Sequence, residues 1–148
     1  MTNRILVPID LSHDVTFDLI FPATTTLARH HSATLHLLAV VPGELGAFPY
    51  VQRGLIDDAR KQAAAQLDDF ARMEYAEDIN WETEALVGPV AKTIVRRAAD
   101  LEAGLIAIAS HDPRASDLLL GGTADRVVRR AHCTVVVLRS NPNWTWSA

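Results

Sequence analysis

Apolar residues gather along the chain in short, nearly unbroken runs that alternate with stretches of helical spacing. Runs rich in aliphatic and β-branched residues predict strands that are buried on both faces, as in a covered parallel sheet. The segment 79–87 alternates more between polar and apolar residues, so we expect it nearer an edge. The predicted strands are RILVPID (4–10), TLHLLAVV (34–41), INWETEALV (79–87), GLIAIAS (104–110) and CTVVVLR (133–139).

The stretches between these runs carry apolar residues three and four positions apart, which is typical of a helix with one buried stripe. A further helix is expected over roughly 14–31, with a kink at Pro22 because proline removes one backbone hydrogen bond. The clear stripes are Leu55, Ala59, Ala63, Leu67 and Phe70; Val90, Ile94, Ala98 and Leu101; and Ala124, Val127, Val128 and Ala131.

The alternation of strands and helices predicts an α/β fold, an open parallel sheet with helices on both faces. The length fits a single domain over residues 1–140, followed by a tail over 141–148. The loop 42–54 is long for a compact domain, which is typical of a functional or mobile segment. In the tail, Trp144 and Trp146 either belong to a frayed end or pack on a partner subunit.

The composition of the chain narrows the classes of function that it can serve. The chain has 148 residues, of which 49% are hydrophobic and 22% charged, with a net charge of −4. An acidic chain is poorly suited to non-specific nucleic-acid binding. No apolar run approaches the length of a membrane span, about 18 residues, and the start does not resemble a leader. Cys133 is the only cysteine, so we expect no internal disulfide and a cytoplasmic protein.

The carboxyl ends of the predicted strands form the first candidate site. In an open parallel sheet, ligands bind beyond these ends, at the point where the strand order reverses. We expect this point to bring together Pro8–Asp10, Val40–Val41 and Ala109–His111. The carboxylate of Asp10 is suited to accept a hydrogen bond from a ribose hydroxyl or from an amine of a ligand. Alternatively, Asp10 or Ser12 caps the helix that follows.

A glycine pair opens the last predicted helix. Gly121, Gly122 and Thr123 lie where free backbone N–H groups and the helix dipole favour an anion such as phosphate. His111 and Arg114 lie upstream in the same loop. The stretch matches neither G-x-x-x-x-G-K-[ST] nor G-x-G-x-x-G. From the residues alone, it is either a phosphate cradle or a tight loop that connects a strand to a helix.

The usual patterns for catalysis and for metal binding are missing from the sequence. There is no G-x-S-x-G of a nucleophile elbow, and no lysine follows the glycine pair. The six histidines have no regular ligand spacing, and Cys133 has no partner cysteine. We therefore expect no catalytic residue, no metal site and no enzyme, with slow ATP hydrolysis or autophosphorylation left open.

Four blocks of the sequence resemble the universal stress protein (UspA-like) family. They are ILVPIDLS, LHLLAVVP, VGPVAKTIVRRA and LIAIASHD…LLLGGTADRVVRRAHCTVVVLR, and they occur in the family's order over nearly the whole chain. The resemblance implies a Rossmann-like fold, similar to adenine nucleotide alpha hydrolases, with a five-stranded parallel sheet of order 3-2-1-4-5. It also implies a homodimer that forms through the strand 133–139.

The last block resembles the F/G-type subgroup, whose pattern S-[HR]-x-P-x5-L-L-G-S-N implies ATP binding. Gly121 matches the late glycine of the family's nucleotide motif, whereas Gly122 stands in the place of a serine. The resemblance implies a site for ATP or AMP, with or without Mg²⁺. By position, this site consists of Pro8, Asp10, Val40, Gly88, Ile108, Ala109, Ser110, His111, Arg114, Gly121, Gly122 and Thr123.

Two functions follow from these residues and from the resemblance. The first is a stress-response regulatory protein that binds an adenine nucleotide at the carboxyl ends of the first, second and fourth strands. The second is a homodimeric interaction protein of the same fold that binds no nucleotide. The nucleotide motif of the family is G-x2-G-x9-G-[ST], and its two early glycines are missing from this chain. Their absence, together with Gly122 in the place of the serine, favours this second function.

Overall fold

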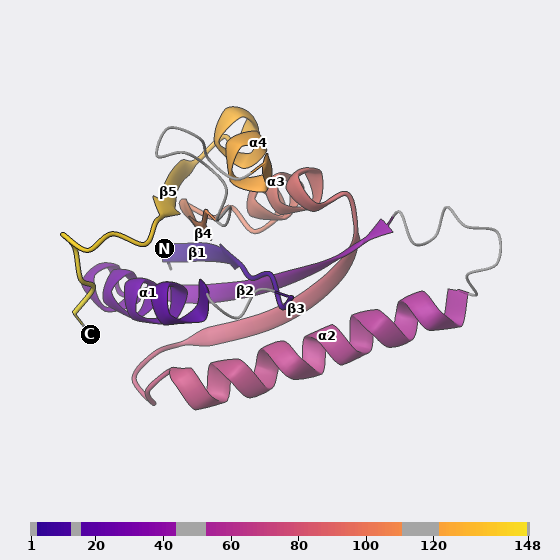
Figure 1. The fold of residues 1–148 in the computed structure, drawn as a ribbon, viewed down its shortest axis with the longest axis horizontal. Coiled ribbons are helices and arrows are strands. Elements are labelled where there is room, and N and C mark those ends of the chain that lie inside the picture. The colour runs from indigo at the N-terminus through magenta and orange to yellow at the C-terminus, as the bar shows by residue number, and fades with distance from the viewer. Residues whose placement is uncertain (1–2, 13–15, 44–52, 111–121, 148) are drawn as a thin grey trace.

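Five strands and four helices make up the part of the chain that the computed structural model describes, residues 3–12, 16–43, 53–110 and 122–147 (Figure 1). Neighbouring strands pair in parallel in the order β3-β2-β1-β4-β5, which confirms the expected α/β fold and sheet order. The strands are β1 (Asn3–Pro8), β2 (Ala33–Pro42), β3 (Trp81–Gly88), β4 (Leu105–Ala109) and β5 (Thr134–Leu138). The helices are α1 (Phe17–His31), α2 (Arg53–Glu74), α3 (Val90–Asp100) and α4 (Gly122–Arg130).

The two faces of the sheet bury different side chains because residues alternate along each strand. Helices α1 and α2 cover one face, and α3 and α4 cover the other (Figure 1). In β1, Ile5 and Val7 lie in the core against α1 and α2, whereas Leu6 lies in the core against α3 and α4. In β2, Leu37 lies in the core against α1 and α2, and Leu38 lies in the core against α3 and α4. Burial on both faces therefore explains the unbroken apolar runs of the sequence.

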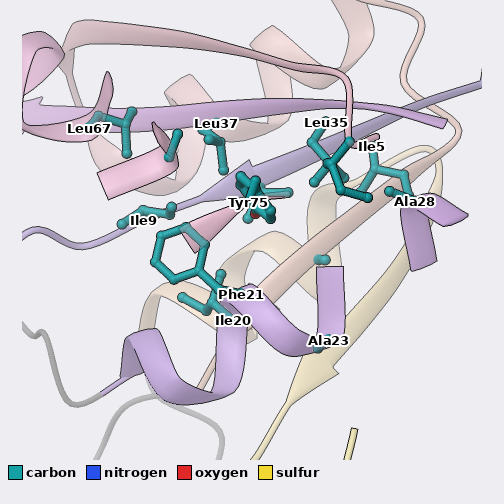
Figure 2. Packing of buried hydrophobic residues seen from close by; sticks show 14 of the residues in the cluster. Ile5, Ile9, Ile20, Phe21, Ala23, Ala28, Leu35, Leu37, Leu67 and Tyr75 are labelled. Carbon is teal, nitrogen blue, oxygen red and sulfur yellow. The ribbon is translucent and has the colours of Figure 1, made fainter. Parts of the chain in front are cut away.

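The core against α1 and α2 contains a group of aromatic side chains (Figure 2). The ring of Phe21 packs edge-on to Tyr75, with ring centroids 5.2 Å apart. The Tyr75 hydroxyl lies 2.7 Å from Thr24 Oγ1, and burial raises the pKa of Tyr75. Since a buried hydroxyl without a partner is costly, this hydrogen bond lets Tyr75 pack inside an apolar core.

The observed helices differ from the expected ones at α1, at the start of α2 and at Val128 of α4, which was expected in the buried stripe but is 42% exposed. Helix α1 begins at Phe17 and runs through Pro22 as one helix. The prediction that Leu55 belongs to the buried stripe of α2 is wrong, because Leu55 is 60% exposed, whereas Leu67 is fully buried. Helix α2 begins beyond the end of β2 (Figure 1), so its first turn has no strand to pack against.

The tail after β5 folds back along α1 (Figure 1). Thr26 Oγ1 donates a hydrogen bond to the carbonyl of Ser147 at 2.6 Å, and Trp146 packs against the core of α1 and α2. A frayed end is therefore the wrong alternative for residues 141–147. Trp144 remains 63% exposed, so it keeps a surface that a partner subunit could cover.

A small polar cluster joins β2, β3 and α3 on the other face of the sheet. His36 Nε2 and Glu84 Oε2 lie 2.8 Å apart, and Arg97 Nε donates to the same carboxylate oxygen at 2.7 Å. Burial raises the pKa of Glu84, but the hydrogen bonds with His36 and Arg97 outweigh burial, so this pKa lies below its ordinary value. The charged carboxylate therefore stabilises the packing of α3 on the edge strand β3.

Shortening Leu67 should destabilise the protein far more than the same change at Leu55. Leu67→Ala opens a cavity in the core against α1 and α2, so we expect the free energy of unfolding to fall by about 2–5 kcal/mol. Leu55→Ala removes an exposed side chain and should change this energy by less than about 0.5 kcal/mol. Urea unfolding followed by far-UV circular dichroism measures both. Equal losses would contradict the orientation of α2.

Replacing Glu84 by glutamine should produce a pH-dependent loss of stability. The pKa of Glu84 is lowered in the folded state, so its stabilising effect is present above the ordinary value of 4.5 and is lost as the pH falls through the folded pKa. We expect Glu84→Gln to cost about 1–2 kcal/mol at neutral pH. The difference from the unmodified protein should shrink in acid.

The exposed neighbour Glu82 provides the control for this experiment. Its side chain is 67% exposed, compared with 24% for Glu84, so Glu82→Gln should cost less than about 0.5 kcal/mol. Urea unfolding is measured from neutral pH to well below 4.5, because the lowered pKa of Glu84 lies under that ordinary value. A loss in Glu84→Gln that stays constant through this range would exclude the charge as its cause.

Candidate functional site

A cavity of about 490 Å³ opens at the carboxyl ends of β1, β2 and β4. Its position follows from the strand order. The chain leaves β1 through α1 on one face of the sheet and leaves β4 through α4 on the other face. Because β1 and β4 are neighbours, the two connections diverge there and leave a crevice, which is where open parallel sheets bind ligands.

The floor of the cavity is apolar and is built from the strand ends. It includes Leu38, Ala39 and Ile108, each less than 5% exposed. Half-buried Val40 and Ala109 complete this surface at the mouth. Small side chains at several of these positions leave space that a larger residue would fill. The cavity can therefore hold a flat apolar group against the ends of the strands.

Seven of the residues predicted for the site line this cavity. The agreement covers the strand ends and the start of α4, which come from four separate parts of the sequence. The residues are Pro8, Asp10, Val40, Ile108, Ala109, Gly122 and Thr123.

The other predicted residues do not contribute to the lining that the structure describes. Ser110 and Gly88 lie outside it. Gly88 has a different role, because a Cβ atom there would lie 2.7 Å from Thr93 Oγ1. Gly88 thus allows β3 to approach α3 closely and does not close one side of the cavity as expected. His111, Arg114 and Gly121 fall outside the described residues.

Asp10 is the one ionisable side chain among the described residues that line the cavity. Its Oδ1 accepts hydrogen bonds from the Ser12 backbone N–H at 3.0 Å and from Ser12 Oγ at 2.5 Å. The alternative in which Asp10 or Ser12 caps the next helix is wrong, since Thr16 occupies the N-cap position of α1. The Asp10 carboxylate is held at the mouth of the cavity and remains exposed.

The start of α4 faces the same cavity through Gly122 and Thr123. The first N–H groups of a helix have no partner within it, and the helix dipole adds positive potential there. Apart from Gly122 itself, its chain neighbours and the adjoining backbone of α4, no described atom lies within 4 Å of the position that a Gly122 Cβ would occupy. The arrangement can therefore place an anionic group at the α4 end of the cavity and an apolar group at the strand ends.

The helices contribute walls that the sequence did not lead us to expect. Helix α1 begins beside the cavity, where Thr16 and Ile20 line it, and α3 supplies Val90 and Ile94. Helix α2 adds one face of its middle part, which consists of Ala59, Gln62, Ala63 and Gln66. The small Ala59 and Ala63, compared with Leu67 and Phe70 further along the helix, were the sequence signal that α2 leaves room near the strand ends.

Two further features of the described residues bear on function. None of the described helices is long and apolar enough to cross a membrane. Within the same part of the chain, no three histidine, cysteine or acidic side chains gather into a group that could hold a metal ion.

Comparisons with known proteins agree with the fold and with the resemblance found in the sequence. The sequence profile of the universal stress protein family matches residues 1–139. Universal stress protein G of Salmonella typhimurium is 26% identical over 143 residues, which cover 94% of this chain and 100% of that protein.

Solved structures of similar proteins share the fold. The structure of universal stress protein UspA from Lactobacillus plantarum has a TM-score of 0.70 and 26% identity, and the match covers 93% of this chain and 97% of that one. The universal stress protein from Archaeoglobus fulgidus in complex with dAMP has a TM-score of 0.65 and 20% identity, over 92% and 97% of the two chains. Because the family profile spans nearly the whole sequence, the chain belongs to the universal stress protein family.

Proposed function

We propose that the protein is a stress-response regulator that binds an adenine nucleotide, ATP or AMP, in the cavity at the carboxyl ends of β1, β2 and β4. The observation that carries this proposal is that an apolar floor and a helix N-terminus share one cavity. Its volume of about 490 Å³ is within the range of small-molecule sites, roughly 300–1,000 Å³. The dAMP complex of the Archaeoglobus fulgidus protein supports an adenine ligand at the level of the family.

Each part of a nucleotide has a chemically suitable place in this cavity. The base packs against the apolar side chains of Val40 and Ile108, since a purine ring has two apolar faces. The Asp10 carboxylate accepts a hydrogen bond from the ribose. The first N–H groups of α4, with the Thr123 hydroxyl, hold a phosphate. In this arrangement Gly122 contributes its backbone N–H and lacks the hydroxyl that serine has in the family pattern.

The proposed function is binding without efficient turnover. Phosphoryl transfer requires positive charge around the transferred group, usually from lysine, arginine or magnesium. The described part of the lining contains one carboxylate and no cationic side chain. A single carboxylate is a poor magnesium site, so Mg²⁺ binds through the phosphates of the nucleotide. The bound nucleotide, which is not turned over efficiently, acts as a signal of state. The cytoplasmic location remains a prediction of the sequence.

We also propose that two copies of the chain pair through β5. This strand is the last in the sheet order, so one of its edges has no partner strand within the described residues. Its residues Val135–Val137 are only half-buried. An exposed apolar edge offers unpaired N–H and C=O groups to another strand. A second copy would satisfy these groups and cover the valine side chains.

Filling the cavity should abolish nucleotide binding. Val40→Trp places an indole against the floor where the base would pack, so we expect the Kd for Mg-ATP to rise at least about tenfold. Identification of the nucleotide released when the purified protein is denatured comes first. Isothermal titration calorimetry of the emptied protein with Mg-ATP then gives the Kd of each variant.

Val87→Trp is the matched control for this experiment. Val87 lies on the adjacent strand β3, is 39% exposed and does not line the cavity. We expect it to bind Mg-ATP as the unmodified protein does. If the unmodified protein binds no adenine nucleotide, the alternative of a homodimeric interaction protein without nucleotide replaces the proposal. If Val40→Trp and Val87→Trp bind Mg-ATP equally well, the nucleotide does not bind in this cavity.

Proline at position 137 should break the dimer without disturbing the sheet. The Ser110 N–H donates to the Leu138 carbonyl at 2.9 Å, and alternate residues of a parallel strand bond to the same neighbour. The N–H of Val137 therefore points to the open edge of β5. We expect Val137→Pro to be a monomer in sedimentation velocity and Val137→Ala to remain a dimer. If both variants have the mass of the unmodified protein, β5 is not the interface.

A further inference from the structure

We propose that α2 supplies the base-selecting wall of the cavity, with Gln62 and Gln66 hydrogen-bonding the edge of a purine that carries an amino group. This inference rests on the proposed function, because it requires that a nucleotide occupies the cavity. It adds two residues on α2 that determine which base is accepted.

The geometry of α2 places both amides on the cavity. Gln62 and Gln66 are four residues apart, so they project from the same face of the helix. Both line the cavity, together with Ala59 and Ala63. The rotation of α2 is fixed further along, where Leu67 is fully buried in the core. The two glutamines therefore lie beside the buried stripe, on the side of α2 that lines the cavity, and remain exposed there.

The amides stand out because the rest of α2 is highly charged. Arg60 and Lys61 both form ion pairs with Asp57, and Arg72 forms one with Asp68. None of the charged side chains that the structure describes on α2 lines the cavity. Gln62 and Gln66 are exposed where they line the cavity, and each neutral amide offers a donor and an acceptor there.

The chemistry of a glutamine amide fits the edge of an aminopurine. Each amide offers a carbonyl acceptor and an NH₂ donor side by side. The amino group and the adjacent ring nitrogen of adenine are a donor and an acceptor at matching positions, and glutamine pairs with adenine in this bidentate way elsewhere. Neither amide has a side-chain hydrogen bond to another described residue, so both are available to a ligand.

The lining also explains why the selecting groups lie on α2. The floor is made of aliphatic side chains that pack on the faces of a ring and cannot distinguish one base from another. The start of α4 recognises charge, which every nucleotide shares. Of the walls, α3 contributes only Val90 and Ile94. Ser12 and Thr16 also line the cavity, but each carries only a hydroxyl. Among the described lining residues, only Gln62 and Gln66 offer a side-chain amide, with donor and acceptor side by side, to the edge of a base.

Three probes separate base recognition from phosphate recognition. Mg-ATP carries both groups, purine riboside triphosphate lacks the amino group, and tripolyphosphate lacks the base. We expect the unmodified protein to prefer ATP over purine riboside triphosphate by about tenfold, the effect of one lost hydrogen bond. In the double variant Gln62→Leu, Gln66→Leu, ATP affinity should fall by a similar factor and the preference should disappear. Tripolyphosphate binding should not change.

Ala65→Leu is the control variant for these titrations. Ala65 lies between the two glutamines on the same helix and is exposed, but it does not line the cavity. A leucine at this position should therefore keep both the affinity and the preference. The double variant Gln62→Ala, Gln66→Ala separates the loss of the amides from any obstruction by leucine. Circular dichroism and thermal unfolding verify that each variant is folded.

The outcomes distinguish this inference from the proposed function. If the unmodified protein binds neither ATP nor purine riboside triphosphate, the proposed function fails and the inference falls with it. If it binds ATP and both double variants keep the affinity and the base preference of Ala65→Leu, the inference alone is overturned. Loss of tripolyphosphate binding in the double variants would also overturn it, because the amides would then act on the phosphates.

Discussion

The constraint on which this structure depends is the burial of both faces of a parallel sheet. Parallel strands need long crossovers, and helices that supply these crossovers must cover both faces to remove the apolar side chains from water. The chain meets this requirement by sending α1 and α2 to one face and α3 and α4 to the other.

Between β1 and β4 the crossovers leave in opposite directions, so no helix covers that point. The cavity is the consequence of this topology. The size of the side chains around the cavity then determines how much space is left for a ligand. Ala39 in the floor and Ala124 in the α4 wall are small and almost completely buried, so neither fills the cavity.

Much of the fold could be predicted from the sequence because its signals are local. A strand buried on both faces must be apolar at nearly every position, so β1, β2, β4 and β5 were visible as runs. The strand ends of the site followed from the sheet order, which places the ends of β1 and β4 beside each other without any knowledge of side-chain geometry.

The misses arose where the environment of a residue depends on distant parts of the chain. Leu55 continues a helical stripe in the sequence, but only the length of the sheet decides whether a strand lies against it. Asp10 has the residue type of a helix cap, yet α1 begins only at Phe17, so Thr16 takes the N-cap position and the Asp10 carboxylate turns to Ser12. Gln62 and Gln66 belong to no motif, and only the rotation of α2 shows that these exposed side chains line the cavity.

For the proposed nucleotide, the charges around the cavity bear on which end of the ligand would contribute most to binding. The N-terminus of α4 supplies about half a unit of positive charge, while Asp10 brings a full negative charge to the same cavity. The chain as a whole carries a net charge of −4, which adds no attraction for an anion. The described residues therefore favour a phosphate only weakly. In the proposed binding mode, the apolar floor and the neutral amides of α2 act on the base, so recognition by the described residues is led by the base.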